Sequence, residues 1–310
     1  MKVVFLGSPP FATPIFDALL ASERHDVLGL VTPPDRPRGR GRSVVRSELA
    51  QRADEAGVPV VQPASTKDPA FVETLGAFGA DCLAVASYGE ILRRDVLELC
   101  PHGALNVHAS LLPRWRGASP IQRAIRAGDA VTGVSIQRMV LALDAGDVIL
   151  SRETPIGPAE TAADLFGRLS TLGAEALLAA LDALEDGTAT FTPQDDERVT
   201  LAPKLTKADG VLDPTLPADE LERHVRAMTT WPGARLALDD DRALVVLEAD
   251  VVPGTEGAAP GTLVDAERFV LATGDGTALR LVRVKPAGKG AMDGAAFLRG
   301  ARLQEGWRAG

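Results

Sequence analysis

The sequence lacks the features that mark several common classes of protein. Its two cysteines, Cys82 and Cys100, show no metal-ligand spacing, and so few cysteines in a chain of 310 residues are typical of a reduced, cytosolic protein. No apolar run approaches the roughly 18 residues that a transmembrane helix requires. The N-terminal run Lys2–Gly7 is too short for a signal peptide and indicates a first strand. We therefore expect a cytoplasmic protein without a membrane partner.

Positive charge is scarce overall but concentrated in two places. The formal net charge is −9, which argues against a general attraction to nucleic acid. Residues 280–308 nevertheless hold seven Lys or Arg against two Asp or Glu. Residues 35–46 hold one acid and five arginines, namely Arg36, Arg38, Arg40, Arg42 and Arg46. Because guanidinium groups suit phosphates and base edges, we interpret both segments as local RNA contacts. The alternatives are a flexible solvated loop and a solvated barrel face.

Short β-branched runs alternate with helical patterns through the first 188 residues. This alternation predicts an α/β fold with a doubly wound, mostly parallel, Rossmann-like sheet, whose strand-end loops carry the site. The first turn, G-S-P-P-F at residues 7–11, lacks the G-x-G-x-x-G pattern. Its prolines also remove donors that a pyrophosphate would need, so we expect no dinucleotide there.

The amino-acid composition changes after Gly187. Residues 189–206 are polar and punctuated by proline, and we interpret them as a linker. Residues 207–310 begin with a helical pattern and continue as short alternating runs separated by turn signals, which is typical of a small β-barrel. We therefore expect a catalytic domain at residues 1–188 and an OB-like β-barrel at residues 207–310.

The chemistry is expected in the stretch from Gly103 to Pro120. Asn106 and His108 lie two residues apart at the end of a predicted strand, Ala104–His108, so their side chains share one face. Asp144 lies in L-D-A-G-D, a turn from which it could reach that strand. An amide and an imidazole beside a carboxylate suit an oxyanion and proton transfer, as in acyl or one-carbon transfer to an amine. Considered alone, each of these residues has a purely structural interpretation as well.

Longer motifs narrow the choice of protein family. The stretch N-V-H-A-S-L-L-P-R-W-R-G-A-S-P-I-Q, with L-D-A-G-D further along, resembles the 10-formyltetrahydrofolate-dependent formyltransferases. The segments D-R-P-R-G-R-G, K-L-T-K-A-D-G, A-T-G-D-G and K-P-A-G-K-G-A-M extend the resemblance, over both domains, to the members of that family that act on methionyl-tRNA.

This resemblance implies roles for individual residues. Asn106, His108 and Asp144 match the catalytic residues of the family. The folate contacts fall on seven positions, namely Ser110, Leu111, Leu112, Pro113, Tyr88, Gly89 and Ile91. Arg40 occupies the position that engages the tRNA acceptor stem, and it forms the candidate tRNA-binding set together with Arg36, Arg38 and Arg42.

The expected activity follows from the same resemblance. A formyl group would pass from 10-formyltetrahydrofolate to the α-amine of methionyl initiator tRNA, for the initiation of protein synthesis. The resemblance also implies a monomer, no metal and a tRNA-binding C-terminal domain. Two alternatives stay open: a formyltransferase that acts on a sugar-nucleotide or glycinamide-nucleotide amine, and a non-catalytic RNA-binding protein. The role of Arg114, Trp115 and Arg116 is open between bordering the tRNA and bracing the loop.

Overall fold

The computed structural model describes residues 1–38, 43–238 and 242–309. Contacts within the chain divide it into two compact units. The first unit comprises Met1–Gly117, Val131–Pro155 and Phe166–Ala202. The second comprises Ala118–Ala130, Ile156–Leu165 and Pro203–Gly310. Successive segments of the chain therefore belong to the two units in turn. The domain boundaries at residues 188 and 206, which we expect from composition, remain a prediction.

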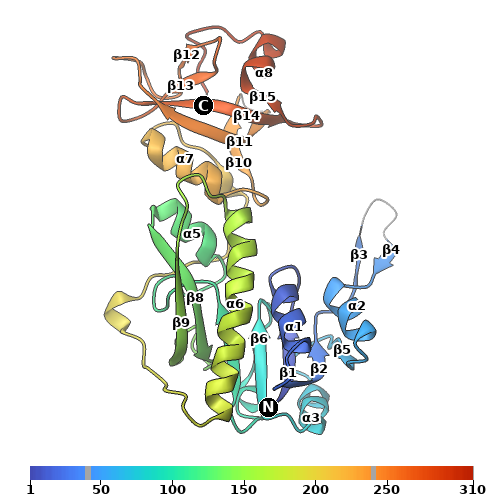
Figure 1. Cartoon of the computed structure of the whole chain (residues 1–310). Helices are drawn as coiled ribbons and strands as arrows, with labels where there is room; N and C mark the ends of the chain where they lie inside the picture. The colour runs from blue at the N-terminus through green and yellow to red at the C-terminus, as the bar shows by residue number, and fades with distance from the viewer. Residues whose placement is uncertain (39–42, 239–241, 310) are drawn as a thin grey trace. The chain divides into compact units, whose positions relative to one another are not determined.

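A seven-stranded sheet forms the centre of the first unit (Figure 1). The pairings among its first five strands are parallel, and the last two strands run antiparallel to their neighbours. This arrangement confirms the predicted mostly parallel sheet. In spatial order the strands are β5 (Val60–Val61), β2 (Asp26–Val31), β1 (Lys2–Gly7), β6 (Cys82–Ala86), β7 (Ala104–His108), β8 (Val131–Arg138) and β9 (Val148–Pro155).

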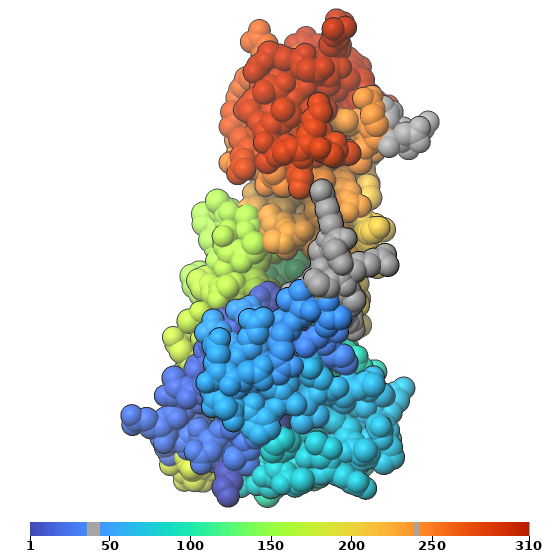
Figure 2. All heavy atoms as spheres, turned by 90° about the vertical axis from the view of Figure 1, so that its right-hand side faces the viewer, coloured from blue at the N-terminus to red at the C-terminus, as the bar shows by residue number. Residues whose placement is uncertain are grey.

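Helices cover both faces of this sheet. They are α1 (Ala12–Leu20), α2 (Glu48–Glu55), α3 (Pro69–Ala77), α4 (Arg94–Leu97) and the long α6 (Ala162–Glu185), with a short 3-10 turn at Asp196–Arg198. Side chains of α3 and α4, among them Leu75 and Val96, form one core cluster with Leu83 of β6 and Ala104 of β7. Figure 2 shows the side of the molecule on which α2 and α3 lie, in light blue and cyan.

The face opposite α3 and α4 is covered by α1 and α6, and α2 contacts α1. The rings of Phe5 and Phe16 lie 5.3 Å apart, which places α1 on β1. A Cβ atom added to Gly173 of α6 would lie 2.8 Å from Cγ1 of Val107 in β7. Glycine therefore allows α6 to approach the strand closely. Since side chains alternate along β7, Val107 points to α6, and Asn106 and His108 point to the other face.

Polar side chains and a glycine mark several helix ends. Oγ of Ser47 accepts a hydrogen bond from the backbone N of Ala50, and Oδ1 of Asp68 accepts one from Ala70, so both residues are N-caps. Gly128 ends α5 (Pro120–Ala127) with a φ of 77°, a conformation that glycine adopts without strain.

The arginine-rich segment is partly regular. β3 (Arg36–Arg38) and β4 (Ser43–Val45) pair antiparallel, so the ends of this segment form a hairpin where we expect an irregular loop. Arg36 and Arg38 lie in β3, but their side chains are outside the description. Arg40 and Arg42 lie outside the described residues altogether. Their expected contacts with tRNA therefore remain predictions.

An antiparallel sheet is the main feature of the second unit. Its strands, in spatial order, are β10 (Ala234–Ala237), β11 (Ala243–Val252), β14 (Ala278–Pro286), β13 (Val270–Ala272) and β12 (Leu263–Asp265), and β15 (Met292–Asp293) also pairs with β14. The helices of the second unit are α5, α7 (Ala218–Ala227) and α8 (Gly294–Ala301), with a 3-10 turn at Ala208–Gly210. The predicted antiparallel β unit is confirmed, and its closure into an OB-like barrel remains a prediction. In the described parts of the chain, no helix is long and apolar enough to cross a membrane.

Candidate active site

Strand β7 carries the two central side chains of the site. Asn106 pairs in register with Gln137 of β8, and His108 pairs with Ser135. His108 is buried, and Asn106 is half-buried at the same edge of the sheet. The alternation predicted from the sequence therefore holds, and both side chains face away from α6.

Asp144 reaches this pair from the turn between β8 and β9. Its Oδ1 atom accepts a hydrogen bond from Nε2 of Gln137 at 2.8 Å and lies 3.5 Å from Nδ2 of Asn106. Its Oδ2 atom accepts a hydrogen bond from the backbone N of Gly117 at 2.9 Å. The same oxygen lies 3.7 Å from Nδ1 of His108. The structure thus brings all three expected catalytic residues together around one carboxylate.

The second ring nitrogen of His108 fixes the tautomer. Nε2 lies 2.9 Å from the carbonyl oxygen of Trp115. A carbonyl oxygen can only accept, so Nε2 carries a hydrogen. In the neutral ring Nδ1 is then the unprotonated nitrogen, and it faces Asp144. This atom is free to take up and release a proton.

The S-L-L-P loop follows β7 and is held by its own hydrogen bonds. Oγ of the buried Ser110 donates to the carbonyl oxygen of Arg114 at 2.7 Å. Ser135 of β8 donates from its hydroxyl to the carbonyl of Ser110 and accepts from the backbone N of Leu112. Leu111, Leu112 and Pro113 remain partly exposed. The loop is therefore rigid at its base and can present apolar side chains to a ligand.

The other three expected folate contacts differ in how they are exposed. The Tyr88 ring is buried in the core cluster, and burial, followed by the nearby charge of Glu90, raises the pKa of Tyr88 to about 12. Gly89 has a φ of 83° in an exposed turn. Ile91 exposes 82% of its surface, which is unusual for so apolar a side chain. Ile91 is thus the residue of this group that can offer apolar contact area.

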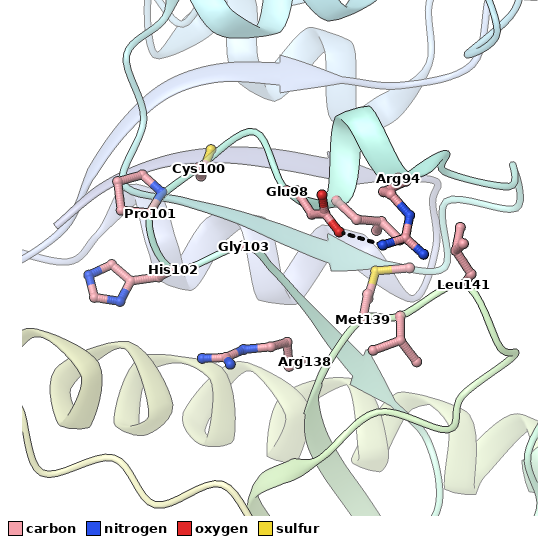
Figure 3. Close-up of a pocket in the computed structure, with 11 residues that line it drawn as sticks. Arg94, Glu98, Cys100, Pro101, His102, Gly103, Arg138, Met139 and Leu141 are labelled. Carbon is pink, nitrogen blue, oxygen red and sulfur yellow. Dashed lines mark hydrogen bonds and ion pairs between the residues drawn. The ribbon is translucent and has the colours of Figure 1, made fainter.

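A cavity of about 450 Å³ opens next to the end of β8 (Figure 3). It is lined by α4, by the turn at residues 100–103 and by residues 138–141. Arg94 and Glu98 form an ion pair at 3.2 Å, on the same side of the cavity as Met139 and Leu141. None of the seven expected folate contacts, all of which the structure describes, lines this cavity. Sequence reasoning missed its lining residues because they come from three separated segments that share no motif.

Arg116 braces the loop that follows the S-L-L-P motif. Its guanidinium donates from Nε to Oε1 of Gln194 at 2.9 Å and pairs with Asp196 at 3.1 Å. Its backbone pairs with the segment at residues 200–202. The backbone N of Trp115 donates to Oγ1 of Thr200 at 2.8 Å. Part of the polar segment that we interpret as a linker is therefore hydrogen-bonded to the active-site loop.

The two thiols are unsuited to nucleophilic catalysis. Burial raises the pKa of Cys82 to about 12 and that of Cys100 to about 11, with smaller contributions from neighbouring acidic groups. Neither offers a thiolate near neutral pH. Potential metal ligands cluster elsewhere within the described residues, at His25 before β2 and at Asp182 and Glu185 on α6. Glu185 there pairs with the N-terminal amine at 2.8 Å.

Known proteins resemble this chain over its whole length. The formyl transferase model matches residues 1–181, and the C-terminal domain model of formyl transferase matches residues 204–302. Methionyl-tRNA formyltransferase from Methylobacterium sp. (strain 4-46) is 46% identical over 99% of both chains. The enzyme of the same name from Streptomyces coelicolor is 43% identical over 100% of both chains.

Solved structures show the same fold at low identity. WlaRD, a sugar 3N-formyl transferase solved in the presence of dTDP and 5-N-formyl-THF, has a TM-score of 0.68 at 13% identity, over 93% of this chain and 98% of its own. HypX from Aquifex aeolicus, in complex with tetrahydrofolic acid, has a TM-score of 0.61 at 20% identity. The match covers 96% of this chain but only 47% of HypX.

Both halves of the chain, and the cluster of Asn106, His108 and Asp144 at the edge of its sheet, thus agree with one assignment. The chain belongs to the formyl transferase family, and methionyl-tRNA formyltransferases are among its relatives.

Proposed function

We propose that this protein transfers the formyl group of 10-formyltetrahydrofolate to the α-amine of methionine esterified to initiator tRNA. The observation that carries the proposal is the full-length match, at 43–46% identity, to relatives named methionyl-tRNA formyltransferase. We also propose, from the sequence, that the protein acts in the cytoplasm as a monomer and without a metal.

The reaction begins with attack of the neutral amine on the formyl carbon. The amine of an esterified amino acid has a lower pKa than that of the free amino acid, because the negative carboxylate is gone. Attack forms a tetrahedral intermediate with a developing oxyanion. The bond from the formyl carbon to N10 of tetrahydrofolate then breaks, and the proton lost by the amine ends on N10. No covalent enzyme intermediate is needed.

Asn106 and His108 are the proposed stabilisers of the oxyanion. The Asn106 amide carries two N–H donors, so one can bind Asp144 while the other binds the oxyanion. His108 contributes through Nδ1, because Nε2 is engaged by the Trp115 carbonyl. When Nδ1 is protonated, it provides a charged donor beside the reacting centre. Donors held in place before the reaction stabilise a transition state strongly, because they need no reorganisation.

Asp144 is proposed to accept and return the proton that moves during the reaction. Gln137 and the backbone N of Gly117 hold its carboxylate, and the 3.7 Å separation from Nδ1 of His108 leaves room for tightening when substrates bind. Asp144 can accept the amine proton directly, through His108 or through a water, and it can return that proton to N10.

The folate is proposed to lie along the S-L-L-P loop and Ile91. The partly exposed Leu111, Leu112 and Pro113 offer apolar contact, and the exposed Ile91 offers more. The cavity beside Met139 and Leu141 is a separate hollow, since none of these folate contacts lines it.

The tRNA is proposed to contact the two basic segments. The first is the segment at residues 35–46, with Arg36, Arg38, Arg40 and Arg42. The second is the strongly cationic C-terminal segment, in which Arg283, Lys285, Lys289, Arg299, Arg302 and Arg308 are exposed. Exposed cations are suited to phosphate contacts, whereas Arg280 of the same segment is engaged by Asp250.

A formylation assay with purified protein tests the proposal. Methionyl initiator tRNA and 10-formyltetrahydrofolate should together give formylmethionyl-tRNA, and omission of either should abolish the product. Parallel reactions with a dTDP-linked amino sugar and with glycinamide ribonucleotide test the alternative acceptors. Turnover on a small acceptor without turnover on tRNA would overturn the proposal. Folate binding without any turnover would favour a non-catalytic RNA-binding protein.

A further inference from the structure

We propose that Gln194, with Arg116 behind it, is a positioning residue that holds the Asp144 turn in its reactive geometry. The inference rests on the proposed function, since it assumes that Asp144 takes part in formyl transfer. It concerns a residue that lies in the polar stretch 189–206 and that no sequence motif singles out.

The amide of Gln194 is fully used inside the first unit. Its Nε2 atom donates to the carbonyl oxygen of Asp144 at 2.8 Å and to that of Gly146 at 2.7 Å. Its Oε1 atom accepts from Nε of Arg116 at 2.9 Å. Because a guanidinium can only donate and a carbonyl oxygen can only accept, these partners fix which end of the amide faces the turn.

The turn needs such support because its backbone is strained. Asp144 has a φ of 48°, a left-handed conformation that residues with a side chain disfavour. Gly146 approaches β8 so closely that an added Cβ atom would lie 1.7 Å from the carbonyl oxygen of Arg138. The two carbonyl groups that Gln194 binds belong to these two residues. Gln194 therefore stabilises the backbone on which the Asp144 carboxylate is mounted.

Arg116 holds the side chain of Gln194 in place. Its side chain is only 11% exposed, and it bridges Gln194 and Asp196. Its backbone N donates to the carbonyl of Thr200 at 2.9 Å, and its carbonyl accepts from Ala202 at 2.7 Å. The next residue, Gly117, donates its backbone N to Oδ2 of Asp144. One short loop thus holds the carboxylate directly and the turn backbone through Gln194.

Two substitutions of Gln194 separate the possible roles. Gln194→Met keeps the length of the side chain and removes its hydrogen bonds. Gln194→Glu keeps the acceptor for Arg116 but sets an oxygen against two carbonyl oxygens. If Gln194 positions Asp144, both variants should lose about 10- to 100-fold in kcat, with KM values for folate and tRNA within about two-fold of wild type. If Gln194 only anchors Arg116, the Glu variant should stay active.

A double-mutant cycle with Asp144→Asn provides the decisive readout. Because Gln194 acts through Asp144, Gln194→Met should lower kcat by less than two-fold in the Asp144→Asn background. Losses that multiply would overturn the proposal, as would wild-type kcat in Gln194→Met. Should Gln194→Met fail to fold, Arg116→Lys replaces it in the cycle with the same criterion. Gln51→Met, at an exposed position of α2, removes an amide that donates to the carbonyl oxygen of Arg46, and it is the matched control that should leave kcat unchanged.

The failure of this inference differs from a failure of the proposed function. Absence of tRNA formylation by the wild-type protein would remove the proposed function. Normal wild-type formylation with an unaffected Gln194→Met variant would remove only the positioning role.

Discussion

Nδ1 of His108 lies 3.7 Å from Oδ2 of Asp144, while the opposite ring nitrogen is held at 2.9 Å by the Trp115 carbonyl. The ring can therefore neither turn over nor use Nε2 without breaking that contact. Proton transfer that uses His108 must therefore pass through Nδ1, on the side of the carboxylate.

The first prediction concerns the charge of Asp144. Asp144→Asn keeps the size of the side chain but removes the carboxylate that can accept a proton beside His108. We expect kcat to fall by about 10²- to 10⁴-fold, the usual range for a lost acid–base group. Steady-state formylation of methionyl-tRNA measures this effect. Asp147→Asn changes the second acid of the same L-D-A-G-D turn and should leave kcat within about two-fold. Equal losses in both variants would assign the effect to the turn rather than to Asp144.

The second prediction concerns the arginine-rich hairpin. Arg40→Ala should raise the KM for tRNA more than the KM for folate, because a guanidinium suits a phosphate backbone. The affinity for tRNA should also fall steeply as salt rises, since phosphate contacts release counterions. Arg52→Ala on α2 removes a surface arginine that pairs with Asp17, and it serves as the control. Equal effects on both KM values, or a flat salt response, would contradict a role of the hairpin as a tRNA clamp.

The third prediction uses two glycines of α6. A Cβ atom at Gly173 would press on Val107 of β7, so Gly173→Ala should destabilise the protein by about 1–3 kcal/mol and lower kcat, because Val107 lies between Asn106 and His108. At Gly167 a Cβ atom meets no atom within 4 Å. Gly167→Ala should therefore stabilise the helix by about 0.5–1 kcal/mol. Urea unfolding and formylation assays measure both effects, and similar behaviour of the two variants would contradict the close packing of α6 on β7.

The fourth prediction concerns a buried histidine in the second unit. Burial, with a smaller contribution from Arg126, lowers the pKa of His224 to about 4, and Nε2 donates to the carbonyl of Asp209 at 2.8 Å. The unfolded chain takes up this proton near the ordinary pKa of about 6.5. The contribution to stability is therefore complete above pH 6.5 and is lost as the pH falls toward 4, by up to about 3 kcal/mol.

His224→Gln keeps an N–H donor and cannot titrate. Urea unfolding between pH 4 and 7 should show a flatter pH dependence for this variant than for wild type. Burial also lowers the pKa of His25, so part of the dependence should persist. His102→Gln, at a partly exposed site, is the control. Unchanged pH dependence in His224→Gln would refute the assignment.

Local patterns account for much of the fold. The strand at Ala104–His108, the cap Asp68 and the stop at Gly128 all follow from short-range signals, and the structure has each of them. The shared face of Asn106 and His108 follows from strand alternation alone. The meeting of Asp144 with this pair is consistent with its place in a turn, but only the antiparallel pairing of β7 and β8 brings it there.

Contacts between residues far apart in the sequence could not be predicted from local patterns. Gln137 gave no clear signal, since its strand also carries Thr132, Ser135 and Arg138. Gln194 had none, because it lies in a polar stretch that composition cannot distinguish from a linker. Its function depends on hydrogen bonds to carbonyl groups about fifty residues earlier in the chain. The pairing of β3 with β4 was also not predicted, because Gly and Pro in that segment favour an irregular loop.

The most direct test of the account is single-turnover formyl transfer from 10-formyltetrahydrofolate to methionyl initiator tRNA by Asn106→Ala and His108→Ala. Each variant removes one proposed donor to the oxyanion. The account predicts that each loses about 2.7–4 kcal/mol of transition-state stabilisation, or about 10²- to 10³-fold in rate, with normal folding and normal binding of both substrates. Transfer at near the wild-type rate by either folded variant would contradict it.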